Sequence, residues 1–181
     1  MPNPIMKPVP CFAAILAAAA LAACAPPAPP LPTVGAVDLG RYYGTWHEIA
    51  RLPNRFQAMC ISDTRATYRP DGTDVSVVNQ CRTADGRLEQ VSGVAKLVEG
   101  SNGAKLRVSF FWPFYGDYWV LQLDPDYRWV LVGEPDRKYA WILAREPDLD
   151  EATLEKLLTR ADALGFDRQA FLRTQHTRPA H

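Results

Sequence analysis

Four cysteines are the side chains of this 181-residue chain best able to form covalent bonds. Cys60 lies ten residues before Pro70, and Cys81 lies ten residues after Asp71, so the pair flanks one predicted hairpin almost symmetrically. Cysteines at this spacing can meet across adjacent strands, and exported proteins fold in an oxidising compartment. We therefore expect a disulfide between Cys60 and Cys81.

The three histidines, His47, His176 and His181, give no sign of a metal site, because none has a spaced cysteine or carboxylate partner. No glycine-rich phosphate loop follows a strand and opens a helix, and no nucleophile elbow is present. The sequence therefore predicts a protein that is not an enzyme and that carries neither a metal nor another cofactor.

The N-terminal stretch has the features of a secretion signal: a charged Lys7 and then an apolar run over residues 12–23 that is too short to cross a bilayer. The run ends in a Leu-Ala-Ala-Cys sequence that resembles a bacterial lipobox, whose cysteine is acylated, for example with palmitate, and becomes the new N-terminus. An ordinary signal peptide with a chance cysteine, or a short buried helix, is the alternative. We expect a signal peptide over residues 1–23 and a lipid anchor at Cys24.

Residues 24–37 begin with that cysteine and contain five prolines, which predicts a semi-rigid spacer between membrane and domain. Ala25, rather than aspartate, follows the cysteine, which in enteric bacteria indicates sorting to the outer membrane. We expect a lipid-anchored protein on the periplasmic face of that membrane. Removal of residues 1–23 takes away one lysine and changes the formal charge from 0 to 19 − 20 = −1, so no basic surface for nucleic acid is predicted.

The folded domain, expected over residues 38–174, reads as short strands separated by turn residues. The predicted strands cover residues 45–51, 61–69, 74–81, 88–98, 104–112, 117–123, 127–133 and 138–145. Near-neighbour hairpins between them predict an all-β fold, an eight-stranded antiparallel up-and-down β-barrel, which has no exposed edges and can hold one small ligand. A β-sandwich is the alternative architecture.

A C-terminal helix should follow the last strand, because Pro147 ends strand pairing and the acidic residues over 148–151 can cap a helix. Its apolar residues recur at helical spacing before Gly165: Leu154, Leu157, Leu158, Ala161 and Leu164. We expect this α-helix to pack on the outside of the barrel and residues 175–181 to form a flexible tail.

Gly44, Trp46 and Arg145 are expected to close one end of the barrel. If Trp46 begins the first strand and Arg145 ends the last, the guanidinium can stack on the indole, which contributes about 0.5–2 kcal/mol. Gly44 permits the tight turn into a strand that starts beside a bulky side chain.

Strand alternation separates inward from outward side chains and thereby predicts the lining of a ligand cavity. The expected lining residues are Ala66, Tyr68, Gly93, Ala95, Leu97, Leu106, Val108, Phe110, Tyr118, Val120, Tyr139, Trp141 and Leu143. The small residues Gly93 and Ala95 should leave space. Which alternate residues point inward stays open for the strands over 61–69 and 117–123. A barrel filled by its own side chains is the alternative to a cavity.

Motifs in order along the chain give a family resemblance. They are GTW at residues 44–46, the aromatic run FFWPFYGDY at 110–118, LDPDY at 123–127 and GEPDRKYAWILAR at 133–145. This pattern resembles the lipocalin family, in particular the bacterial outer-membrane lipoprotein lipocalins and their plant temperature-induced and apolipoprotein D relatives. The resemblance covers residues 38–172.

The resemblance implies a protein that holds a fatty acid or a lysophospholipid in its barrel, for storage, transport or repair of envelope lipids. Loops around residues 53–60 and 111–116 would control access to the cavity. It also raises an enzymatic alternative, because the animal lipocalin-type prostaglandin D synthase isomerises a lipid with a cysteine near the strand of Cys60, which would then be a free thiol. A filled structural barrel is a third hypothesis, and the oligomeric state stays open.

Overall fold

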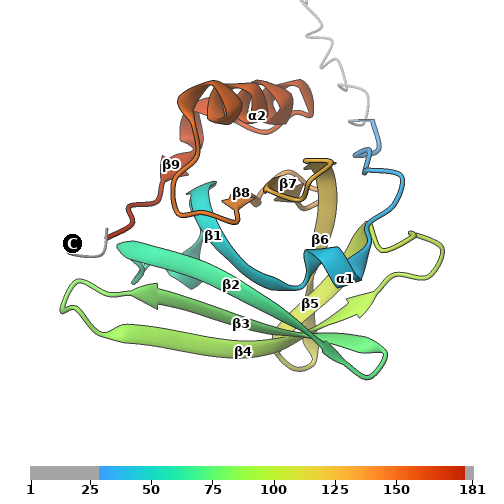
Figure 1. Ribbon diagram of the computed structural model, residues 1–181, viewed down its shortest axis with the longest axis horizontal. Helices are drawn as coiled ribbons and strands as arrows, with labels where there is room; N and C mark the ends of the chain where they lie inside the picture. The colour runs from blue at the N-terminus through green and yellow to red at the C-terminus, as the bar shows by residue number, and fades with distance from the viewer. Residues whose placement is uncertain (1–28, 178–181) are drawn as a thin grey trace, which may run out of the picture.

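The computed structural model describes residues 29–177, in which eight strands form one closed antiparallel barrel (Figure 1). The strands are β1 (Gly44–Arg51), β2 (Ser62–Asp71), β3 (Asp74–Arg82), β4 (Leu88–Leu97), β5 (Lys105–Phe111), β6 (Phe114–Leu123), β7 (Trp129–Gly133) and β8 (Ala140–Ala144). Each pairs with the next, and β1 closes the ring because it pairs with both β8 and β2. The expected barrel is confirmed, with strand ends within three residues of those predicted.

Antiparallel order places alternate loops at opposite ends of the barrel. The loops over 52–61, 83–87, 112–113 and 134–139 lie at one end, which we call the mouth. The short helix α1 (Leu39–Tyr42) and the turns over 72–73, 98–104 and 124–128 lie at the other, closed end.

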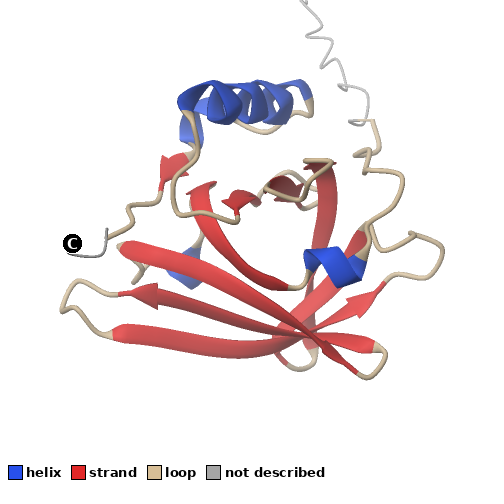
Figure 2. Cartoon of the chain, in the orientation of Figure 1, coloured by secondary structure: helices blue, strands red, loops and turns tan. Residues whose placement is uncertain are grey.

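Helix α2 (Glu151–Ala163) covers one outer wall of the barrel (Figure 2). Asp150 caps its N-terminus, accepting a hydrogen bond from the backbone N–H of Thr153 at 2.8 Å. On the buried face Leu157 belongs to the same apolar cluster as Leu131 and Ile142 of the barrel wall. The predicted C-terminal helix and its position are therefore confirmed.

Residues 29–37 lie against the barrel instead of forming part of the expected spacer. Leu31 is buried in the cluster under α2, and the backbone N–H groups of Val34 and Val37 donate to the carbonyls of Val120 and Asn102 at 2.9 Å. Residues 25–28, the predicted signal peptide and Cys24 lie outside the described part of the chain, so the anchor stays a prediction.

The C-terminal segment fills a seam between β1 and β2, which pair only from Gly44 to His47 of β1. After the 3-10 turn η2 (Arg168–Ala170), β9 (Leu172–Arg173) pairs with the far half of β1, and Gln175 bridges to Ser62. Thr177 donates from its N–H and its hydroxyl to Asp63 at 2.7 and 2.9 Å. The boundary expected after Thr174 is thus corrected: residues 175–177 pack on the barrel, and residues 178–181 lie outside the described residues.

Arg145 closes the barrel against Trp46, whose side chain is fully buried. The guanidinium carbon lies 3.9 Å from the centre of the indole ring. Its nitrogens donate to the carbonyls of Thr45 at 3.0 Å, Arg41 at 2.6 Å and Tyr127 at 3.3 Å, so one side chain joins β1, α1 and the turn before β7. Gly44 has a φ of 103°, and a Cβ there would lie 3.2 Å from Arg145 Nη1.

Arg145→Lys should lower the free energy of unfolding by about 2–3 kcal/mol, because an ammonium cannot reach several carbonyls in different directions while it covers the indole. Urea unfolding followed by tryptophan fluorescence measures the change. Arg41→Lys is the matched control: Arg41 is exposed, its guanidinium lies 4.2 Å from the centre of the Tyr127 ring, and it donates to the carbonyl of Pro125, so a loss below about 1 kcal/mol is expected. Equal losses in the two variants would contradict the role given to Arg145.

Candidate functional site

Two apolar clusters divide the barrel wall into an outer set under α2 and an inner set. In β8, Ile142 packs outward and Leu143 inward; in β6, Leu121 packs outward and Val120 inward. The inward faces of the two strands that the sequence left open follow from the inner set, which contains Ala66 and Tyr68 of β2 and Val120 of β6. The expected lining residues that lie in the inner set are Ala66, Tyr68, Ala95, Leu106, Val108, Phe110, Tyr118, Val120, Trp141 and Leu143.

The inner set is fully buried at some positions and partly accessible at others. The side chains with no exposed area are Trp46, Ala95, Val120, Val130 and Val132. Other inner side chains face the same interior and still remain partly accessible, namely Val108, Phe110, Tyr118 and Trp141. A filled barrel would bury both groups alike, whereas here part of the inner wall stays accessible.

Three expected lining residues lie elsewhere or act differently. Gly93 leaves no space, because a Cβ there would lie 2.6 Å from the Phe110 ring, which occupies that place. Leu97 is 40% exposed and belongs to neither cluster. Tyr139 lies in the loop before β8, where its ring centre is 5.6 Å from that of Phe56 at the mouth.

Three tyrosine hydroxyls meet inside the barrel. Tyr118 Oη lies 2.7 Å from Tyr42 Oη and accepts a hydrogen bond from Tyr68 at 3.0 Å. Burial raises the pKa of Tyr68 to about 12 and the pKa values of the other two well above the ordinary value, so all three stay protonated. Three donors share two bonds, which leaves one hydroxyl proton for water or a polar ligand atom. No strand pattern in the sequence indicates this triad, because Tyr42 comes from α1, outside the strands.

Glu48 is a buried carboxylate on β1, 2% exposed, that the sequence analysis did not single out. Gln57, in the 3-10 turn η1 (Arg55–Gln57), donates to Glu48 at 2.7 Å and accepts from the indole N–H of Trp141 at 3.0 Å. Burial raises the pKa of Glu48, while hydrogen bonds from Thr174 and Gln57 and the charge of Arg51 oppose that rise. The network fixes the β1–β2 loop to the inner wall. Its only sequence signal is a charged residue two positions after inward-facing Trp46.

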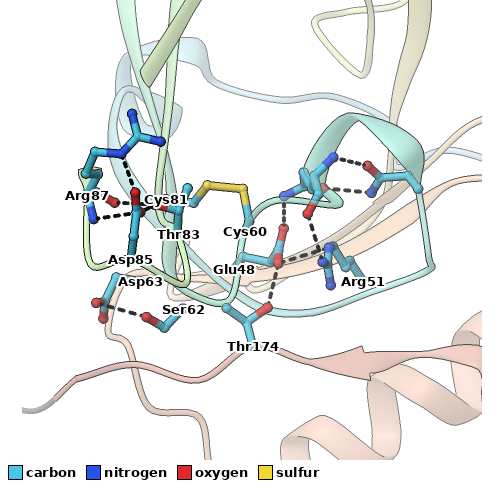
Figure 3. Close-up of a disulfide and its surroundings, with 12 residues drawn as sticks. Glu48, Arg51, Cys60, Ser62, Asp63, Cys81, Thr83, Asp85, Arg87 and Thr174 are labelled. Atoms are coloured by element: carbon cyan, nitrogen blue, oxygen red, sulfur yellow. Dashed lines mark hydrogen bonds and ion pairs between the residues drawn. A yellow bond between two sulfur atoms is a disulfide. The ribbon is translucent and has the colours of Figure 1, made fainter. Parts of the chain in front are cut away.

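A disulfide joins Cys60, just before β2, to Cys81 of β3 at the mouth (Figure 3). The expected pairing is confirmed. A link across 21 residues restricts the unfolded chain and stabilises the fold by about 3 kcal/mol. Cys60 in its bonded form offers no thiolate, so the enzymatic alternative lacks its nucleophile in this structure.

An acidic pocket of about 250 Å³ lies at the mouth end of the barrel, lined by residues 115–117 of β6 and 134–136 of the β7–β8 loop. Burial raises the pKa of Glu134 to about 7, and the carboxylates of Asp136 and Asp117 add repulsion that Lys138 partly offsets. This surface therefore changes charge near neutral pH.

Within residues 29–177, no group of three His, Cys, Asp or Glu side chains is placed to hold a metal ion. None of the described helices is long and apolar enough to cross a membrane.

Comparison with known proteins gives consistent matches. The lipocalin-like domain family matches residues 37–176. The chain is 41% identical to temperature-induced lipocalin-1 of Arabidopsis thaliana over 144 residues, 74% of this chain and 76% of the relative. It is 41% identical to the outer membrane lipoprotein Blc of Escherichia coli K12 over 145 residues, 78% and 81% of the two chains. Among solved structures, insecticyanin from Manduca sexta superposes with a TM-score of 0.69 at 25% identity, covering 83% and 87% of the two chains.

Glu134→Gln should make the protein more stable than wild type above neutral pH. The folded pKa of about 7 is above the unfolded value of 4.5, so raising the pH between these values ionises the unfolded chain first and favours unfolding. Below about pH 4.5 both states are protonated and the contribution vanishes. Melting temperatures at about pH 5 and pH 8 test this, with Glu99→Gln, an exposed carboxylate at the closed end, as the control. A wild-type pH response in Glu134→Gln would contradict the assignment.

Tyr118→Phe should lower the free energy of unfolding by about 1–3 kcal/mol, because it leaves two buried hydroxyls without their shared partner. Tyr68→Phe removes a single hydrogen bond and should cost less, about 1 kcal/mol. Denaturant titrations of both variants measure the difference. If the two variants lose the same stability, Tyr118 is not the centre of the triad.

Proposed function

This chain belongs to the lipocalin family, and we propose that it binds one acyl lipid, a fatty acid or a lysophospholipid, inside its barrel. Lipocalins generally bind small hydrophobic molecules. The observation that supports a lipid ligand here is the group of apolar and aromatic inner side chains that stay accessible although they face the interior.

An extended acyl chain suits this interior. Each buried CH₂ group contributes about 0.8 kcal/mol before the losses from immobilising the ligand. The tail would pass Trp141 and Phe110 and lie over Val108 and Tyr118, and the polar head would stay at the mouth near Gln57. Loops 53–60 and 111–116 would then control access, as the sequence suggests.

The chain is also proposed to be an envelope protein, made with a signal peptide over residues 1–23 and held on the periplasmic face of the outer membrane by an acylated Cys24. The Leu-Ala-Ala-Cys sequence, the following Ala25 and the similarity to outer membrane lipoproteins of several bacteria support this location. Its role would be the storage, transport or repair of envelope lipids, carried out by binding rather than by catalysis.

A structural barrel without a ligand is the second candidate. It is favoured by the complete burial around Trp46 and by the Phe110 ring, which fills the space above Gly93. The two candidates differ in whether a lipid binds stoichiometrically.

Native mass spectrometry of residues 25–181, purified without detergent and mixed with fatty acids and lysophospholipids, should show one acyl lipid per chain. Phe110→Arg should weaken binding at least about tenfold, because it places a charge against the tail. Ser92→Arg is the matched control, since Ser92 is exposed on the outward face beside Gly93. An apo mass that never shifts across the panel would favour the filled barrel.

A further inference from the structure

Large apolar side chains that the described chain exposes gather at the mouth. Leu88, at the start of β4, and Leu172 of β9, beside the mouth half of β1, are 49% and 47% exposed. In the β1–β2 loop and at the start of β2 the exposed side chains are Phe56, Met59 and Ile61. Leu97 is the single member of this group at the closed end among residues 29–177. Clustered exposed apolar surface marks a contact with a partner or a membrane.

The β5–β6 hairpin extends this apolar rim into an aromatic tip, which we define as Phe111, Trp112 and Phe114. Their exposed fractions are 70%, 83% and 77%, the three highest of the exposed large apolar residues. Consecutive exposed residues point to both faces of a hairpin, so no packing of one face against the barrel could bury them all. Exposed tryptophan beside phenylalanine is typical of protein surfaces that enter the head-group region of a bilayer.

The N-terminal chain leads to the same end. The backbone N–H of Val37 donates a hydrogen bond to Asn102 at the closed end, and that of Val34 donates to Val120 on β6. Further toward the N-terminus, the carbonyl of Pro29 accepts a hydrogen bond from Arg137 at 2.6 Å. Arg137 belongs to the 134–139 loop of the mouth. Cys24 lies five residues before Pro29, and five residues span at most about 18 Å. An acyl chain on Cys24 would therefore reach the membrane from the mouth end of the barrel.

We propose that the barrel stands with its mouth on the lipid leaflet that holds its anchor, with the aromatic tip inserted among the lipid head groups. The orientation rests on the proposed acylation of Cys24, whereas the exposed tip is independent of it. A ligand would then pass between the leaflet and the interior without crossing bulk water. The rim carries charges of both signs, including Arg87 and Lys138 paired with Asp85 and Asp136, so neutral lipids suffice.

Quenching of tryptophan emission by lipid tests this orientation. The full chain, produced in a bacterium that acylates lipoproteins, is reconstituted into phosphatidylethanolamine–phosphatidylglycerol vesicles with brominated acyl chains. Trp112 is one of five tryptophans, so lipid contact should remove up to about a fifth of the emission. Trp112→Phe should abolish that quenching. Trp129→Phe, at the start of β7 near the closed end, should leave it unchanged.

Three results would overturn the proposal. Quenching that persists in Trp112→Phe but is lost in Trp129→Phe would place the closed end on the membrane. Tryptophan emission of the unmodified chain that brominated lipid does not quench would place the tip in water. A dimer in sedimentation that dissociates on Trp112→Ser would assign the tip to a second copy of the chain.

The same sample separates this inference from the proposed function. The mass of the N-terminal peptide reports whether Cys24 is acylated, and lipid binding is measured independently. An acylated, lipid-binding protein with unquenched Trp112 would refute the orientation alone. If Cys24 carries no acyl chain, the proposed anchoring fails, and the quenching is repeated with vesicles added to the free protein, where an unquenched Trp112 still refutes insertion of the tip.

Discussion

Closure of the barrel through β1 is the constraint on which the rest of the structure depends. β1 must bond to β8 on one side and to β2 on the other, and it meets β2 only as far as His47. The first half of the strand therefore forms a tight closed end, which Arg145 completes by bonding to three backbone segments over the Trp46 ring. The second half leaves a seam that the C-terminal segment has to fill, because unpaired strand edges are costly.

The interior consequently has polar groups in two places as well as apolar side chains. The hydroxyls of the tyrosine triad meet toward the closed end, and Glu48 with Gln57 and Trp141 lies nearer the mouth. Buried polar groups are tolerated because they bond to one another. The apolar part of the interior includes Val108 and Phe110, and the proposed acyl tail would lie there.

The mouth has a stabilised β1–β2 loop and, at the same end, exposed apolar side chains. The Cys60–Cys81 disulfide and the Gln57 network hold the β1–β2 loop in place, and the same end exposes apolar and aromatic side chains to solvent. Rigid support under an apolar rim fits a surface that meets lipid without unfolding. The docked N-terminal segment, fixed at Pro29 by Arg137, brings the predicted anchor to this end.

The sequence by itself predicted the strands and the outer helix from period-two alternation and turn residues, and the ordered family motifs decided for a barrel over a sandwich. The spacing of Cys60 and Cys81 made them candidate partners, and the structure shows that they are bonded. Trp46 and Arg145 could also be paired in advance, since closure brings the first and last strands together. Only the tertiary structure decided the triad, the Glu48 network, the course of residues 29–37 and the packing of residues 175–177. Each of these depends on where segments distant in sequence meet. Gly93 shows the same limit: a small residue suggests space, but the neighbouring strand's Phe110 decides whether that space is empty.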